Sequence, residues 1–372
     1  MLIYLLVFLI VEILAVLSCK KESSKKFKIA IYPALIVIIL SIFGGLRDLT
    51  IGTDVLVYGS NWFEIATNFS SLSSYINYID SSDVGYLFIN YVVSRFTSDV
   101  NMFLIVLQII CNGLVVATLY KYRDKVPFWL SLLVYLCVFY CRTFNILRQA
   151  IALSLVFYAI RFLDENRPIR FIITVLIAST FHFTAIVSLI IILFRKICEL
   201  SPRFKTMFVV IIVIITFIIV FFIKDMISIL YSLGIVNLRI YNYLYDFATS
   251  QFSVTVIELV FKVLMLALVL LQNKKMRDNF KLNNLLVLCA IVDFVIYQIR
   301  SVIMYSDRLS FYFGYFLMLI FPQAAVSLKA KGRDKLVLNC LFAVFLLGYW
   351  YYKFVYSGSC EVYPYSSQVL GI

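Results

Sequence analysis

Charged residues are scarce in this sequence: Lys, Arg, Asp and Glu make up 14% of its 372 residues, against 63% hydrophobic residues. A soluble domain typically has about 25% charged residues, so the composition excludes a soluble protein. Glycine and proline are also rare, with twelve and six residues, and they seldom interrupt the apolar runs. No polar stretch is long enough to form a separate soluble domain. We therefore expect one all-α transmembrane domain over residues 1–372.

Histidine occurs once, at His182, and the eight cysteines lie mostly inside apolar runs, where cysteine behaves as a small hydrophobic residue. A metal site needs several ligands close together, so we expect neither a metal nor another cofactor. The net charge of +13 does not indicate nucleic acid, because basic residues that flank apolar runs orient membrane helices.

Apolar runs recur from end to end, many of them close to the ~20 residues that span a bilayer. They lie at about 2–18, 29–43, 101–119, 127–141, 146–161, 171–194, 206–223, 254–271, 282–299, 309–327 and 336–353. These runs predict a polytopic integral membrane protein with about ten crossings and one short re-entrant or half-helix hairpin.

Six basic turns between these runs hold most of the 33 Lys and Arg residues. The turns lie at 20–28, 121–125, 161–170, 195–205, 274–281 and 329–335. The positive-inside rule assigns all six to the cytoplasm. Both termini and the loops 44–100 and 224–253 are then external.

This topology requires the run 171–194 to fold back on itself, because a basic turn lies at each of its ends. A break near 179–182 would divide the run into two half-helices. The alternative is one 24-residue crossing, which would place the turn 195–205 outside. Residues 84–97 are too short and too polar for a crossing, so we expect an interfacial or re-entrant helix there.

Arginine predominates among the basic residues that lie outside the cytoplasmic turns. Its planar fork grips phosphate or carboxylate, whereas topology needs only positive charge. In the first external loop, Arg47 is a candidate for holding a phosphate. Asp54 is a candidate for a general base or for binding a sugar hydroxyl. The alternative for both is an internal ion pair that closes the loop.

A second group of polar residues opens the apolar run 146–161, with Arg142 before it and Arg148 and Gln149 in its first turn. Arginine opposes the dipole of a helix at its N-terminus, where free N–H groups attract anions. An anion bound by both arginines would remove this conflict. The alternative is that both arginines extend to lipid headgroups.

His182 interrupts the run 171–194 between two phenylalanines. A histidine can accept a proton from a hydroxyl, and the alternative is a buried hydrogen-bonding residue. Arg300 ends one apolar run, and Arg308 with Tyr312 one turn later opens the next. These three residues are a further candidate for binding an anionic substrate.

The chain resembles the EpsG family, within the broader group of Wzy-like polysaccharide polymerases, and the resemblance extends through nearly its whole length. The residues that carry it are Arg47, Gly52, Thr53, Asp54, Tyr58, Asn145, Arg148, Gln149, Ala150, Ile151, Ala152, Ala178, Ser179, Phe181, His182, Phe183, Thr184, Ala185, Asp307, Arg308, Tyr312, Pro364 and Tyr365. Phe183 and Thr184 depart from the family pattern, which has a proline or small residue and then serine.

The resemblance implies a glycosyltransferase similar to the C-type membrane glycosyltransferases, acting at the outer, periplasmic face of the bacterial plasma (inner) membrane. It implies that a growing glycan passes from polyprenyl (undecaprenyl) pyrophosphate to an incoming lipid-linked repeat unit of a capsule, O-antigen or other surface polysaccharide. A flippase and a chain-length regulator are the partners expected of such an enzyme. A lipid-linked oligosaccharide flippase and a polysaccharide ligase are the alternative functions.

Within this hypothesis Arg148, Arg142 and Arg308 bind the pyrophosphate, and His182 or Asp54 is the base for the acceptor hydroxyl. Arg47 helps to place the lipid-linked substrate. Arginines would take the role that a metal ion has in soluble sugar transferases, because they stabilise the charge of the leaving group.

Overall fold

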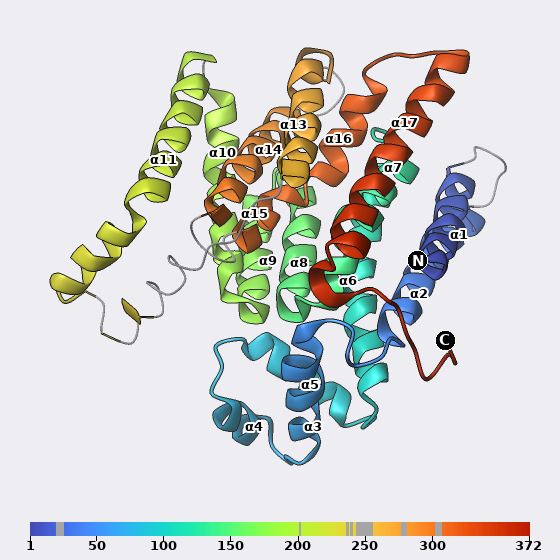
Figure 1. Cartoon of the computed structure of the whole chain (residues 1–372), viewed down its shortest axis with the longest axis vertical. Coiled ribbons are helices and arrows are strands. Elements are labelled where there is room, and N and C mark those ends of the chain that lie inside the picture. The colour runs from blue at the N-terminus through green and yellow to red at the C-terminus, as the bar shows by residue number, and fades with distance from the viewer. Residues whose placement is uncertain are drawn as a thin grey trace. The chain divides into compact units, whose positions relative to one another are not determined.

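The structure is a computed structural model, and it describes residues 1–19, 26–200, 202–235, 238, 241–242, 256–276, 281–301 and 307–372. Every regular element in these ranges is helical (Figure 1), which agrees with the predicted all-α class. The predicted basic turns 20–28 and 274–281 and the predicted external loop 224–253 lie partly outside the described residues. Residues 224–232 of that predicted loop are helical, as the end of α11 (Pro202–Ser232).

The chain divides into two compact units. Unit 1 consists of Met1–Ile186 and Phe321–Ile372, and unit 2 consists of Val187–Ile320. Each unit is described by itself below.

The main helices of unit 1 form a bundle in which α2 packs against α6, and α8 packs against both α6 and α9. These helices are α1 (Leu2–Ser18), α2 (Lys26–Gly45), α6 (Val100–Lys121), α7 (Phe128–Val134), α8 (Leu147–Asp164), α9 (Pro168–Phe181) and α17 (Gly332–Trp350). Helix α7 continues as a π-helical turn, Tyr135–Phe139, and a 3₁₀ turn, Tyr140–Phe144. Nearly every side chain from α7 to the start of α8 is buried, so this stretch forms the core of the unit.

Gly45 allows α2 and α6 to approach each other closely. A Cβ atom there would lie 2.7 Å from the backbone N and Cα of Ile105. We expect Gly45→Ala to destabilise the protein by roughly 1–3 kcal/mol, the usual cost of overpacking. Gly113→Ala on α6 is the matched control, because no atom lies within 4 Å of the added methyl group. Thermal unfolding in detergent measures the difference, and equal midpoints for the two variants would contradict the prediction.

The C-terminal segment packs back onto the end of α2. The Tyr365 ring stacks on Phe43 with 4.2 Å between centroids, and its hydroxyl donates to the Phe43 carbonyl at 2.8 Å. Burial raises the pKa of the Tyr365 phenol to about 12, so the hydroxyl stays protonated at neutral pH. The tail therefore has a structural role in unit 1.

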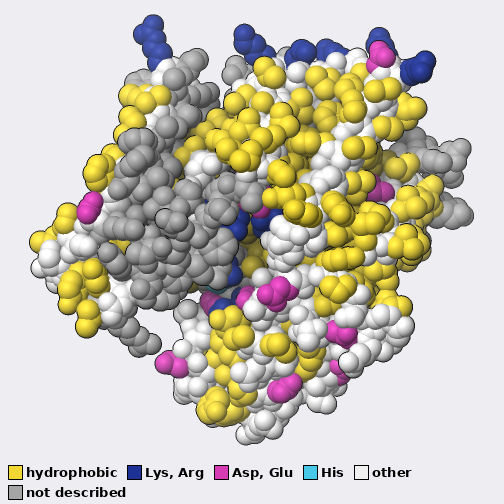
Figure 2. All heavy atoms as spheres, in the orientation of Figure 1, with side chains coloured by type: hydrophobic (Ala, Val, Ile, Leu, Met, Phe, Trp, Pro, Cys, Tyr) yellow, Lys and Arg dark blue, Asp and Glu magenta, His cyan; other side chains and the backbone are white. Residues whose placement is uncertain are grey.

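Three of the predicted basic turns lie at one end of unit 1. Lys121 pairs with Glu165, and this hydrogen bond holds the pKa of the Glu165 carboxyl below its usual range. Pro127 directly precedes α7, and Lys331 and Lys335 belong to the basic turn before α17. All three residues line one cavity, so these two turns lie close together. In Figure 2, basic side chains lie along the top edge of the view above α17, and hydrophobic side chains lie below this edge. The shared end agrees with the sequence topology, and its cytoplasmic location stays a prediction.

The predicted external loop 44–100 is folded. It contains a π-helical turn, Val55–Ser60, followed by α3 (Asn61–Thr67), α4 (Leu72–Ile79) and α5 (Val84–Ser94). These three helices enclose a small core of Ala66, Tyr75 and Leu87. They lie at the end of unit 1 opposite the start of α17 (Figure 1). The helix expected over 84–97 is present as α5.

Helix α9 ends where the sequence predicts a break. His182, which follows its last residue Phe181, has an extended backbone with φ −155° and ψ 114°. A 3₁₀ turn, Phe183–Leu189, leads to α10 (Ile190–Glu199) in unit 2. Two helices thus replace a continuous 24-residue run, while the return of the second one to the cytoplasmic face stays a prediction.

Unit 2 contains α10, α11 (Pro202–Ser232), α13 (Val256–Met276), α14 (Asn283–Gln298), α15 (Asp307–Gly314) and the first residues of α16 (Leu317–Val326). Across the described residues of both units, three helices are long and apolar enough to cross a membrane, and the bent pair of α15 and α16 makes a fourth if it is one span. The three are Val100–Lys121, Val256–Met276 and Gly332–Tyr356. Several shorter apolar helices accompany them, as in a helical membrane protein. The predicted number of about ten crossings stays a prediction.

Candidate functional site

Arg148 lies in the first turn of α8 and faces the folded segment between α2 and α6. Its Nη1 atom donates to Oδ2 of Asp83 at 2.6 Å. Its Cζ atom lies 3.6 Å from the centroid of the Tyr58 ring and 5.2 Å from that of Trp62. The side chain is 17% exposed. The guanidinium group is therefore held by one carboxylate and two aromatic rings, and the side chain keeps some exposed surface.

Asp83 occupies the N-cap position of α5, where an aspartate usually accepts hydrogen bonds from the first free N–H groups. Its side chain makes no such bond and pairs with Arg148 instead. The carboxylate is 5% exposed, so the charge needs this partner. From the sequence, Asp83 has only the local signature of a helix cap, a polar residue before an apolar run, and it is not among the predicted site residues.

His182 approaches the same carboxylate oxygen as Arg148. Its Nδ1 atom is 3.8 Å from Oδ2 of Asp83, which is beyond hydrogen-bonding distance. Nδ1 is buried and has no hydrogen-bond partner among the residues that the structure describes. The imidazole is 22% exposed. One carboxylate oxygen thus has a guanidinium group at hydrogen-bonding distance and an imidazole close by, and we call Tyr58, Trp62, Asp83, Arg148 and His182 the Asp83 cluster.

Two contacts hold α5 and its Asp83 in place. A Cβ atom on Gly85 would lie 2.3 Å from Oγ1 of Thr180, so α5 approaches the end of α9 closely at this glycine. The Tyr86 hydroxyl donates to the Tyr58 carbonyl at 2.9 Å. Burial raises the pKa of the Tyr86 phenol, so the donor proton stays in place at neutral pH.

Arg47 is fully buried, and its donors bind backbone carbonyls. It donates to Ile51 at 3.2 Å, to Phe144 at 2.9 Å and to Gly44. Burial lowers the pKa of its guanidinium group to about 10, so Arg47 remains charged at neutral pH. These bonds fasten the loop that follows α2 to the residue Phe144 before α8.

Asp54 is brought to the same end of unit 1 by this loop. Its backbone N–H donates to Oδ1 of Asn145 at 3.0 Å. Gly52 has φ +91°, and a Cβ atom there would lie 2.4 Å from the Phe144 carbonyl oxygen, so the close contact requires glycine. The two stretches that the sequence selected, 47–54 and 142–152, are therefore in direct contact.

Arg142 and Gln149 are more deeply buried than Arg148, with 6% and 3% exposure. Nε of Arg142 donates to the Val138 carbonyl at 3.0 Å, and Nη2 donates to the Tyr349 hydroxyl at 3.3 Å. Arg142 thus faces α17, whereas Arg148 contacts Asp83 of the α5 segment.

Unit 2 holds a second polar cluster, on α13 and α14 and the residues that follow α14. The Tyr297 hydroxyl donates to Oε2 of Glu258 at 2.7 Å, and Nη1 of Arg300 donates to the same oxygen at 3.3 Å. Nε of Arg300 is 3.7 Å from Oδ2 of Asp307. A further pair joins Nζ of Lys262 to Oδ2 of Asp293 at 2.6 Å. Arg300 is therefore fixed by carboxylates on both sides.

The other two candidates of unit 2 lie on α15, where Arg308 is half-buried and Tyr312 is fully buried. Glu258 was missed from the sequence, although a signal was available. Glu258 and Lys262 are four residues apart, as are Asp293 and Tyr297, and this spacing places side chains on one helix face. Charged groups at such positions of apolar helices usually have a partner.

Within the ranges that the structure describes, no three His, Cys, Asp or Glu side chains gather as metal ligands would. The Asp83 cluster offers a cation for an anionic group, an imidazole for a proton and aromatic rings for a sugar face. Neither a curated protein nor a solved structure matches the chain. The model of the EpsG family matches residues 30–367, a range that contains the whole Asp83 cluster. The chain thus belongs to the EpsG family, a family of Wzy-like polymerases.

Proposed function

We propose that this membrane protein is a surface polysaccharide polymerase that transfers a growing glycan from polyprenyl pyrophosphate to the incoming lipid-linked repeat unit. The observation that carries the proposal is that Arg148 and His182 approach the same oxygen of Asp83, at 2.6 Å and 3.8 Å. The two groups that such a transfer needs, a cation for the leaving group and a base for the acceptor, share one carboxylate.

Arg148 is assigned to the leaving group. When the bond between the sugar C1 and the pyrophosphate oxygen breaks, negative charge accumulates on the pyrophosphate. A guanidinium group already in place stabilises that charge more in the transition state than in the ground state. Tyr58 and Trp62 hold the guanidinium plane, and the exposed part of the side chain is available for a phosphate oxygen.

His182 is assigned to the acceptor. Its imidazole accepts the proton of the acceptor hydroxyl while the hydroxyl oxygen attacks C1. We propose that Asp83 serves both residues in turn. When the pyrophosphate engages Arg148, the carboxylate is free to move closer to Nδ1 of His182, which is 3.8 Å away. A carboxylate at Nδ1 orients the imidazole and stabilises its protonated form. Asp54 is the alternative base.

The remaining candidates have supporting roles in this proposal. Arg47 acts as a positioning residue, because its donors fasten the loop that carries Asp54. Arg142 and Gln149 line the start of α8, and Arg142 assists with the pyrophosphate. Substrate binding by Arg308 and Tyr312 is proposed from the family resemblance, and substrate binding by Arg300 from its charge at the end of an apolar run.

Asp83→Asn tests the shared carboxylate. The amide keeps the shape of the side chain and loses its charge, so we expect the polymerisation rate to fall by about 10²-fold or more, as for a residue that orients a catalytic histidine. Asp80→Asn is the matched control, because Asp80 is an exposed aspartate three residues earlier. A double-mutant cycle with His182→Gln measures the coupling. Independent, additive effects of the two substitutions would contradict the assignment.

The function itself is tested with purified protein and lipid-linked repeat units in vesicles, with no other enzyme present. We expect a ladder of products whose reducing ends remain on the lipid carrier, and an equal ladder after EDTA treatment if the reaction is independent of metal. Single repeat units without a ladder, under conditions that support a known polymerase, would contradict the function. Transfer of single units across the bilayer without chain growth would favour a flippase.

Location and partners follow from the same proposal. We propose that undecaprenyl pyrophosphate is the carrier, that the Asp83 cluster faces the periplasm, and that the chain lies in the bacterial inner membrane. The supporting observation is that the Asp83 cluster is formed at the end of unit 1 away from its basic turns. A flippase would supply the substrate, and a chain-length regulator would end the reaction.

A further inference from the structure

Helix α1 contains a single charged residue, Glu12. Both carboxylate oxygens are buried, and neither has a hydrogen-bond partner among the residues that the structure describes. A carboxyl group without a partner in an apolar environment loses the solvation free energy that it would have in water. A residue of this kind in a membrane helix usually marks a binding or functional site.

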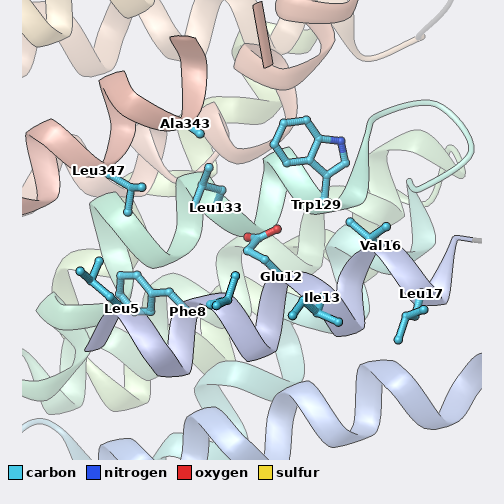
Figure 3. Close-up of a pocket in the computed structure, with 11 residues that line it drawn as sticks. Leu5, Phe8, Glu12, Ile13, Val16, Leu17, Trp129, Leu133, Ala343 and Leu347 are labelled. Carbon is cyan, nitrogen blue, oxygen red and sulfur yellow. The ribbon is translucent and has the colours of Figure 1, made fainter. Parts of the chain in front are cut away.

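Glu12 points into a groove between α1 and α17, with α7 as its floor (Figure 3). The groove has a volume of about 580 Å³, and the rest of its lining is almost entirely apolar. Trp129 and Leu133 of α7 lie above Glu12 in the view, and Ala343 of α17 lies above Leu133 (Figure 3). The indole nitrogen of Trp129 is on the far side of its ring from Glu12 (Figure 3). The groove is therefore a hydrocarbon surface with one acidic point.

The depth of Glu12 restricts what can fill the groove. Glu12 is six residues before Ser18, the last residue of α1, which corresponds to roughly 9 Å along the helix axis. An acyl chain would cover the apolar walls but has no donor for the carboxylate. A lipid headgroup has donors but stays near the membrane surface. A neighbouring helix can present a Lys or Arg side chain at this depth.

We propose that this groove binds one membrane-spanning helix of another protein, with a Lys or Arg at the level of Glu12. The two charges complement each other, and the small Ala343 leaves room for the basic side chain to enter between α1 and α17. The groove involves none of the residues assigned to the glycosyl transfer, so this binding site goes beyond the proposed function. Its natural occupant would be a partner in the membrane and not a substrate.

A synthetic membrane helix tests the proposal. The probe has about 20 Leu and Ala residues, the length that spans a bilayer, with one central Lys. A second probe has Leu in place of Lys. The full-length protein carries an acceptor fluorophore on a C-terminal tag, the probes carry a donor, and energy transfer is measured in phosphatidylcholine vesicles. We expect the Lys probe to associate about tenfold more tightly than the Leu probe, from a polar contact worth about 1–2 kcal/mol.

Two variants separate the carboxylate from the shape of the groove. In the Glu12→Gln variant, the affinity for the Lys probe should fall to the affinity for the Leu probe. Ala343→Phe should fill the groove and weaken both probes, whereas Leu341→Phe should change neither. Leu341 is the matched control, because it lies on the same helix, is 57% exposed and does not line the groove.

The proposal is wrong if the Lys probe binds the Glu12→Gln variant as tightly as the unmodified protein. It is also wrong if the protein self-associates through this groove, which would appear as energy transfer between labelled copies that Glu12→Gln abolishes. The remaining alternative is a lipid with an amine headgroup, and native mass spectrometry detects such a bound lipid. If Glu12→Gln removes the lipid and the probe fails to displace it, the groove is a lipid site and the proposal is wrong.

Discussion

Arg148→Ala is expected to lower the rate of polymer formation by about 10²–10³-fold, the usual effect of removing one preorganised donor to a developing negative charge. The side chain stacks on Tyr58 and donates to Asp83, so its guanidinium group needs little reorganisation before it meets a pyrophosphate. The measurement is the initial rate of ladder formation by purified protein in vesicles. A full rate in this variant would contradict the assignment to the leaving group.

The same substitution leaves the buried Asp83 carboxylate without its partner, and such a loss typically costs about 3–5 kcal/mol of stability. Two further variants therefore separate folding from catalysis. Arg148→Lys keeps the positive charge and loses the planar fork, so we expect a folded protein with a low rate. The double variant Arg148→Ala with Asp83→Ala removes both charges, and it should regain stability without regaining activity.

Arg123→Ala is the matched control for Arg148. Arg123 is also an arginine that lies over a tyrosine ring, with its Cζ atom 4.1 Å from the centroid of Tyr120. It lies in the basic turn between α6 and α7, at the other end of α6 from the Asp83 cluster. An unchanged rate in this variant would show that losing an arginine stacked on an aromatic ring does not by itself impair polymerisation.

His182→Gln is expected to lower the single-turnover rate by about 10²–10⁴-fold, the range for general acid–base catalysis, with donor binding unchanged. Glutamine can form a hydrogen bond to Asp83 but cannot accept the proton of the acceptor hydroxyl. The measurement combines a single-turnover rate with a separate binding assay for the lipid-linked donor. Phe183→Leu is the control, because Phe183 follows directly and is 63% exposed.

Asp54→Asn decides between the two candidate bases. If His182 is the base, we expect this variant to change the rate much less than His182→Gln. If Asp54→Asn lowers the rate more than His182→Gln does, Asp54 is the general base. Its loop is held beside the start of α8 by Asn145. Equal and small effects of both substitutions would contradict general base catalysis by either residue.

Features that depend only on residues close together in the sequence could be predicted from the sequence. The scarcity of charge and the apolar runs predict membrane helices, because each helix must hide its own backbone polar groups from lipid. The basic turns that flank α6, α8 and α17 share one end of unit 1 as the charge pattern predicts. The end of α9 at Phe181 follows from the polar residues around it.

Pairings between distant residues were not available from the sequence. Asp83 and Arg148 are 65 residues apart, and Asp83 has a complete local explanation as a helix cap. Arg47 looks from its position like a free external arginine, yet its donors bind the carbonyls of its own loop and of Phe144, 97 residues away. A residue type limits what a side chain can bind, whereas the packing of helices decides which partner it meets.

The sequence by itself therefore determined the helical membrane class, the family resemblance and most of the candidate residues, since composition, charge pattern and motif order are local properties of the chain. The tertiary structure decided which candidates form a site. It joined Arg148 and His182 through Asp83, buried Arg47 among carbonyls and left Glu12 in an apolar groove. The physical reason is that the environment of a charge in a membrane protein, and with it the cost of the charge, is set by helices that pack together from distant parts of the chain.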